Sequence, residues 1–166
     1  MSVATVTGGC KLPSPLPKRV CTRTVLPPNS FYGCRGKGAV SLVDIRDIAA
    51  LAVIVLAATG HEGKPYSSGE EALTNEQVAE KISRVAGREI TYKDLPPVEF
   101  KKALLSSGTQ EWSVDALVDL QLLYREGKAS LLTDDVERLT GRKPKTFDQF
   151  ARDYAFAFQD EATAAS

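Results

Sequence analysis

Residues 44–58 read DIRDIAALAVIVLAA and decide the fold class of this chain. The stretch contains no glycine or proline, begins with Asp44, which suits an N-cap, and ends with Ala58 shortly before Gly60, so it predicts a helix. Its apolar residues form one stripe and also cover the other faces: Ile45, Ile48, Ala49, Ala52, Val55 and Leu56 on the stripe, and Leu51, Val53 and Ile54 beside it. A helix that is apolar on every side requires burial on more than one side.

Downstream of this helix, two capping boxes predict the starts of two further helices. Thr74 and Gln77 form the first box, and Gly87 is placed to end the helix that follows it. Thr146 and Gln149 form the second box.

The positions of prolines and glycines and the alternation of apolar residues predict the remaining helices and strands. Pro97 suits the first turn of a helix, residues 110–126 form a longer one, and Thr133 caps a short one. Short segments at 64–68 and 89–95 have the length and alternation typical of strands. The chain is therefore predicted to be α/β, mostly helical with a few short strands.

Two of the helices carry an apolar stripe that we interpret as a core face, since such stripes are more often core than cofactor contacts. The stripes comprise Trp112, Ala116, Leu120 and Leu123 in the first helix, and Phe147, Phe150, Ala151, Tyr154 and Phe158 in the second.

Composition excludes several classes of protein. The 166 residues include 21 basic and 21 acidic side chains, a net charge of zero that argues against a general nucleic-acid binder. A hydrophobic share of 43% is typical of a soluble domain, and no apolar run approaches the roughly 18 residues of a membrane span. Because a signal-peptide core is also absent from the sequence, we expect a cytoplasmic protein without nucleic-acid or membrane partners.

The charges are unevenly distributed along the chain. Residues 1–43 contain six basic side chains, no acidic one, all three cysteines and five of the nine prolines. We therefore predict a basic, Pro- and Cys-containing, partly ordered segment over 1–38, a folded lobe over 39–160 and a frayed tail over 161–166. Within these limits, 44–158 should form the ordered core and 1–20 should be weakly held.

Metal chemistry has little support in the sequence. Cys10, Cys21 and Cys34 are too widely spaced to form a CxxC pair, and the single histidine, His61, is distant from all of them. Zinc normally requires four ligands in short-range pairs, so we expect no metal and reduced thiols.

Hydrolysis is a weak alternative. His61 lies in the turn THEGK near Glu62, Ser67 and Ser68, which could be combined into a triad, but no GxSxG elbow is present. Proximity along the chain does not supply triad geometry, so a solvent-facing loop histidine is the favoured interpretation.

A dinucleotide site requires a strand, a glycine turn and then a helix whose N-terminus faces the pyrophosphate. Residues 3–9 (VATVTGG) fit the strand and the turn. The following residues, KLPSPLP at 11–17, cannot continue as a helix because of their prolines. We therefore expect no cofactor-binding residues of this type.

From Arg23 onward, the order of segments resembles the NmrA-like atypical short-chain dehydrogenase/reductase family over roughly three-quarters of the chain. Residues 22–31 (TRTVLPPNSF) are similar to that family's LRPN-x-F strand and loop, and residues 43–50 (VDIRDIAA) to its VDVRDIA helix start. Residues 63–74 are similar to its GK-x-Y…G-x-EALT segment, and residues 133–142 and 146–151 to its C-terminal signature.

The resemblance implies that residues 39–160 form the C-terminal, substrate-side lobe of a Rossmann-type protein. In intact family members an N-terminal Rossmann half binds NAD(P), and we expect that half to be missing here. Other departures are Pro27 in place of an arginine, a short connection between Phe31 and Gly38, and no Tyr-x-x-x-Lys pair. By resemblance, Asn29 and Phe31 are the substrate-binding residues, although a loop amide and a core aromatic would explain them too; catalytic residues stay unassigned.

Three functions follow as hypotheses. The first is a truncated NmrA-like NAD(P)-dependent oxidoreductase-type protein that retains the substrate-binding lobe, takes a small-molecule ligand and lacks competent cofactor binding. The second is a non-catalytic binding or regulatory module, and the third is an enzyme with a repurposed pocket, such as a small hydrolase.

Self-association is the expected consequence of truncation. Without a Rossmann half, the helix at 44–58 would lose its cover, and a homo-oligomer would bury it again. A competing interpretation is that the N-terminal segment folds back over it with five aliphatic side chains: Leu12, Leu16, Val20, Val25 and Leu26.

Overall fold

Four short strands and six α-helices make up the computed structural model over the residues that it describes, 29–66 and 69–158. The expectations for residues 1–28, with Cys10, Cys21 and the glycine turn at 8–9, and for the tail at 161–166 lie outside these residues. The prediction of an α/β chain that is mostly helical with few short strands is confirmed.

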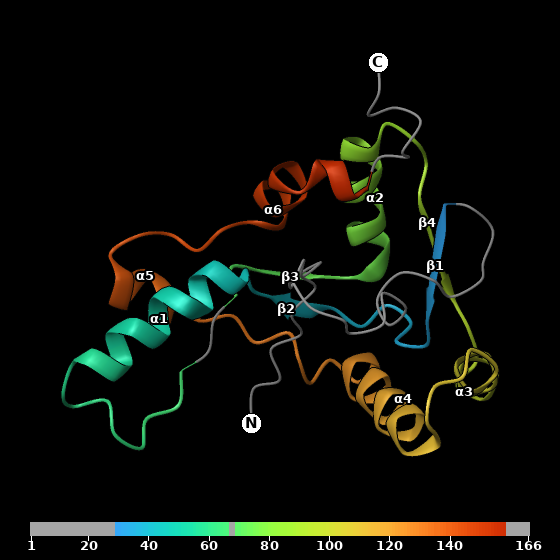
Figure 1. Ribbon diagram of the computed structural model, residues 1–166, viewed down its shortest axis with the longest axis horizontal. Helices are drawn as coiled ribbons and strands as arrows, with labels where there is room; N and C mark the ends of the chain where they lie inside the picture. Colours follow the sequence, from blue (N-terminus) through green and yellow to red (C-terminus); the bar gives the residue numbers. More distant parts are fainter. Residues whose placement is uncertain (1–28, 67–68, 159–166) are drawn as a thin grey trace.

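The strands form two separate pairs near the middle and one end of the molecule (Figure 1). β1 (Ser30–Gly33) pairs in parallel with β4 (Thr91–Asp94), and β2 (Val40–Leu42) pairs antiparallel with β3 (Glu71–Leu73). β4 confirms the strand expected within 89–95.

The strand expected at 64–68 is wrong over the part that is described. Residues 64–66 are irregular and largely exposed, and the strand that follows the helix is β3 instead. β3 exists because Leu73 is buried opposite Val40 in the ladder with β2. Three residues are too few to show alternation in the sequence.

The helices begin where the sequence predicts. α1 (Ile45–Ala57) is capped by Asp44, whose carboxylate accepts from the backbone N–H of Arg46 at 2.8 Å. Both capping boxes are formed, at the starts of α2 (Asn75–Ala86) and α6 (Phe147–Asp153). A short 3₁₀ turn, η1 (Ala155–Ala157), follows α6.

The remaining helices contain one correction. α3 (Pro97–Ser106) and α4 (Glu111–Arg125) lie as expected. Thr133 does not cap α5 (Asp135–Thr140): it forms an isolated bridge with Gly69, and Asp134 takes the N-cap position without a side-chain hydrogen bond. The need to bridge to a distant segment determines the conformation of Thr133.

The hydrophobic core lies where β2, β3, α2, α4 and α6 meet. Its buried members come from β2, β3, α4 and α6: Val40, Leu42, Leu73, Tyr124, Phe147 and Ala151. α2 packs against them with three partly buried residues, Val78, Ile82 and Val85. The predicted aromatic face is confirmed as core over Phe147, Phe150 and Ala151, and the ring of Phe150 lies 5.6 Å from that of Phe147 and 4.9 Å from that of Tyr154. Tyr154 and Phe158 lie beyond the end of α6 and outside the core cluster.

The inner face of α4 differs from the predicted stripe. Trp112 is 72% exposed and Leu123 is 42% exposed, whereas Val114 and Tyr124 are buried. α4 is apolar on several sides, so its sequence alone does not fix which side packs. The close approach of Gly38 to Tyr124 decides it: a Cβ at Gly38 would lie 2.1 Å from the Tyr124 carbonyl oxygen.

A buried carboxylate joins α1 to the C-terminal segments. Asp47 is fully buried and accepts two hydrogen bonds of 2.6 Å, from Nη1 of Arg142 and from the backbone N–H of Lys145. These bonds hold the connection between α5 and α6 against the first turns of α1.

We expect Arg142→Gln to lower the free energy of unfolding by about 3 kcal/mol, because it leaves the Asp47 carboxylate buried without its counterion. Urea unfolding measures the change. The control is Arg84→Gln, which removes an ion pair with Glu80 whose two side chains are each 65% exposed and should cost less than about 1 kcal/mol. Equal effects of the two variants would contradict a structural role for Asp47.

The outer face of α1 is uncovered. Leu51 is buried, but Ile45 is 52%, Val53 67% and Leu56 86% exposed. The described residues of one chain therefore do not bury this helix on more than one side, and the expectation that they would is wrong. Figure 1 shows α1 beside α5, with the C-terminal end of α1 at one edge of the molecule.

Self-association through α1 stays a prediction. We expect sedimentation equilibrium at micromolar concentration to give a dimer mass that Leu56→Glu reduces to a monomer, since a charge on this exposed site opposes burial. Val98→Glu on α3, where the valine is 79% exposed, is the matched control and should stay dimeric. A wild-type monomer would favour the competing interpretation that the N-terminal segment covers the helix.

Candidate functional site

The candidate site lies along the parallel pair of β1 and β4. In α/β proteins, ligands bind outside the carboxyl ends of parallel strands. Here these ends are Gly33 and Asp94, which are paired in register. The segment that follows β1, GCRGKG at 33–38, turns back toward β2 and α4.

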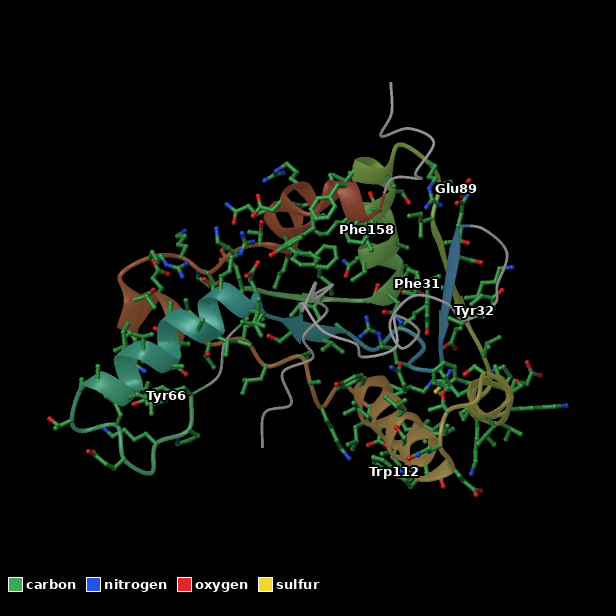
Figure 2. All side chains as sticks on the ribbon, in the orientation of Figure 1. Phe31, Tyr32, Tyr66, Glu89, Trp112 and Phe158 are labelled. Carbon is green, nitrogen blue, oxygen red and sulfur yellow. The ribbon has the colours of Figure 1, made fainter. Side chains whose placement is uncertain are left out.

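The two predicted site residues occupy different places on β1. Phe31 lies in the middle of the strand, half-buried, with its ring centroid 5.4 Å from that of Tyr92 on β4 (Figure 2). Asn29 precedes the strand, is exposed, and has a φ of 82°, a left-handed conformation that asparagine tolerates better than most residues. Asn29 lies four positions before Gly33, about 13 Å along an extended chain. Of the two predicted site residues, Phe31 is the one whose ring contacts Tyr92.

Asp94 fixes the turn at the carboxyl end. Its Oδ1 accepts from the backbone N–H of Gly36 at 2.8 Å and from the hydroxyl of Tyr92 at 3.0 Å. Its Oδ2 accepts from Nη2 of Arg125 on α4 at 2.9 Å. One carboxylate thus joins the turn, the strand and the helix.

Polar groups from three elements converge on Gly33. A Cβ at this glycine would lie 3.1 Å from the Tyr92 hydroxyl and 3.3 Å from both Nδ2 of Asn75 and Oε1 of Gln121. Any larger residue would press on these atoms. Oε1 of Gln121 is buried and has no hydrogen-bond partner among the described residues.

Burial determines the protonation states at this site. It raises the pKa of Tyr92 to about 12, and the carboxylate of Asp94 adds to the shift, while the Asn75 amide and the backbone N–H of Arg35 oppose it. Burial and Asp94 also raise the pKa of the Cys34 thiol, which Arg125 opposes. Tyr92 is therefore a neutral hydrogen-bonding group and Cys34 a neutral thiol at physiological pH, and neither is an activated nucleophile.

Alkaline titration tests this assignment. The last tyrosine to ionise should do so at about pH 12, and Tyr92→Phe should remove that step from the phenolate absorbance curve. Because the pKa is raised in the folded state, the contribution of the neutral phenol to stability is complete below pH 10 and is lost as the pH rises through 12. Loss of a step near pH 10 in the variant would contradict the assignment.

The hydrolytic alternative gains no support from the structure. Nδ1 of His61 lies 2.6 Å from the Tyr66 hydroxyl, and the Glu62 carboxylate accepts from the backbone N–H of Gly60. Ser67 and Ser68 lie outside the described residues. Figure 2 shows Tyr66 at the opposite end of the molecule from Phe31. No carboxylate within the described part of the chain bonds to His61.

Two searches of the described residues gave negative results. No group of three or more His, Cys, Asp or Glu side chains among them could hold a metal ion. No helix in the same part of the chain has the length and apolarity needed to cross a membrane.

Sequence reasoning did not identify the polar half of this site. Tyr92 lies within the segment 89–95 that is predicted only as a strand, and Arg35, Asp94 and Gln121 have no local motif. The sequence signal that could have located these groups is the set of three glycines within 33–38, because glycines allow another segment to approach the backbone closely.

The chain matches known reductases over most of its length. It is 38% identical over 129 residues to an NAD(P)H azoreductase of Xenophilus azovorans, covering 77% of this chain and 45% of that protein. It is 36% identical over 111 residues to quinone oxidoreductase 2 of Escherichia coli, covering 66% of this chain and 38% of that protein. No family model matches the chain.

The solved structures agree. The crystal structure of the NADPH-dependent quinone oxidoreductase from Escherichia coli superposes with a TM-score of 0.69 and 28% identity, over 76% of this chain and 46% of that one. The chain therefore spans just under half the length of the proteins it matches. Together with the shared order of segments, these matches confirm the predicted resemblance to NmrA-like NAD(P)H-dependent reductases, and the partial coverage is consistent with a C-terminal part of such a protein.

Proposed function

We propose that this chain is the substrate-binding lobe of an NAD(P)H-dependent oxidoreductase-type protein and does not form a competent dinucleotide site by itself. The observation that carries the proposal is the pair of Phe31 and Tyr92 on two parallel strands, beside the polar groups around Gly33. The relatives of the chain include an azoreductase and a quinone reductase, and the azo compounds and quinones in these names are conjugated acceptors.

The residues of the lobe suit such an acceptor. The paired rings offer a surface on which a flat conjugated molecule can stack. The neutral Tyr92 hydroxyl and the buried Gln121 oxygen lie next to this surface and can orient polar substituents. NAD(P)H bound to the intact protein would supply the hydride, and the residues of this lobe would position the acceptor.

The connections of the parallel strands support the second half of the proposal. β1 continues through 33–38 into β2, and β4 continues through Leu95 and Pro96 into α3. Neither of these connections is a glycine turn that leads into a helix, the arrangement that binds a pyrophosphate.

Calorimetric titration with menadione and with NADPH tests both halves. We expect menadione to bind the wild-type chain and Phe31→Leu to weaken it about tenfold through loss of ring stacking, while NADPH shows no low-micromolar binding. Phe156→Leu is the matched control, because Phe156 is 59% exposed and lies outside the site.

The outcomes separate the hypotheses. NADPH binding at low micromolar concentration would overturn the cofactor statement, and failure to bind menadione would overturn the acceptor statement. Binding without turnover after addition of NADPH is the behaviour of the non-catalytic module.

A further inference from the structure

Among the described residues, Arg35 is a buried cation that forms no ion pair with a carboxylate. It follows β1 by two residues and is only 5% exposed, among the lowest values for charged residues in the described chain. Its Nε is buried and has no hydrogen-bond partner, and it forms no ion pair with any described residue. A buried guanidinium without a counterion is unfavourable unless another group offsets its charge.

The neighbouring carboxylate, that of Asp94, already has other hydrogen-bond and ion-pair partners. Asp94 accepts hydrogen bonds from Gly36, Tyr92 and Arg125, so its carboxylate neutralises Arg125 and not Arg35. The groups that act on Arg35 electrostatically are Tyr92, Tyr124 and the exposed Glu76, and burial outweighs them and lowers the pKa of its guanidinium. Two residues further along, Lys37 is exposed and adds a second positive charge to the same turn.

Arg35 is linked to the proposed acceptor surface through Tyr92. The backbone N–H of Arg35 acts on the Tyr92 hydroxyl, and the Tyr92 ring packs on Phe31. The Tyr92 hydroxyl also interacts electrostatically with the Arg35 guanidinium, so a molecule stacked on the two rings would have this guanidinium near the hydroxyl end of Tyr92. The planar fork of arginine matches two oxygens of a carboxylate, sulfonate or phosphate.

We propose that Arg35 binds an oxyanion substituent of the acceptor, so that this lobe selects conjugated acceptors that carry a carboxylate, sulfonate or phosphate over neutral ones. The inference rests on the proposed function, since it assumes that the acceptor occupies the surface of Phe31 and Tyr92.

Calorimetry with a matched pair of probes tests it: naphthalene-2-sulfonate, which carries the anion, and 2-naphthol, which does not. We expect the wild-type chain to bind the sulfonate at least about tenfold more tightly. Arg35→Gln should abolish this preference. Lys37→Gln removes the same charge from an exposed position in the same turn and should retain the preference.

Equal wild-type affinities for the two probes would overturn the inference, and this comparison does not depend on any variant folding. Loss of the preference in Lys37→Gln as well would also overturn it, because it would show general charge attraction. Inorganic phosphate distinguishes the source of the anion: if it binds as tightly as the sulfonate, the site takes a free anion and not a substituent. If menadione binds but the sulfonate is not preferred, only the Arg35 inference fails; if neither binds, the proposed function fails.

Discussion

The buried carboxylate of Asp47 holds together segments that are almost a hundred residues apart in sequence. Its two oxygens accept from Arg142 and from the backbone of Lys145, which fixes the connection between α5 and α6 on α1. A carboxylate with no exposed surface is stable only when such donors surround it. α1, which contributes few large side chains to the core, is therefore positioned mainly by polar contacts at its N-terminal end.

A second set of charges continues this connection toward the core. Glu71 on β3 accepts from the backbone N–H of Phe147 at 2.6 Å and pairs with Lys81 on α2, which also binds Asp148. The start of α6 is thereby fixed between β3 and α2, and Phe147 is directed into the core. The position of the aromatic face of α6 thus depends on charged residues that lie outside that face.

The candidate site is arranged by the same kind of interaction at the other end of the molecule. Asp94 joins the turn after β1 to α4 and thereby determines where Arg35 lies. A parallel pair of only two strands has little stability of its own, so these polar contacts and the packing of α2 against β4 are what keep β1 and β4 in register. The site is therefore connected to α4 through the ion pair of Asp94 with Arg125.

The sequence by itself determined the features that depend on neighbours within one turn of helix. The capping boxes at Thr74 and Thr146, the Asp44 cap and the glycine stops are local interactions, and the structure confirms them. The order of segments also predicted the resemblance to NmrA-like reductases, which the similar proteins confirm. Tertiary structure decided the rest, because it depends on residues that are far apart in the chain: the buried face of α4, the existence of β3, and the contact of Tyr92 with Phe31. The isolation of Arg35 belongs to the same group, since a residue's counterions are determined by which distant segments pack against it and by what those segments already bind.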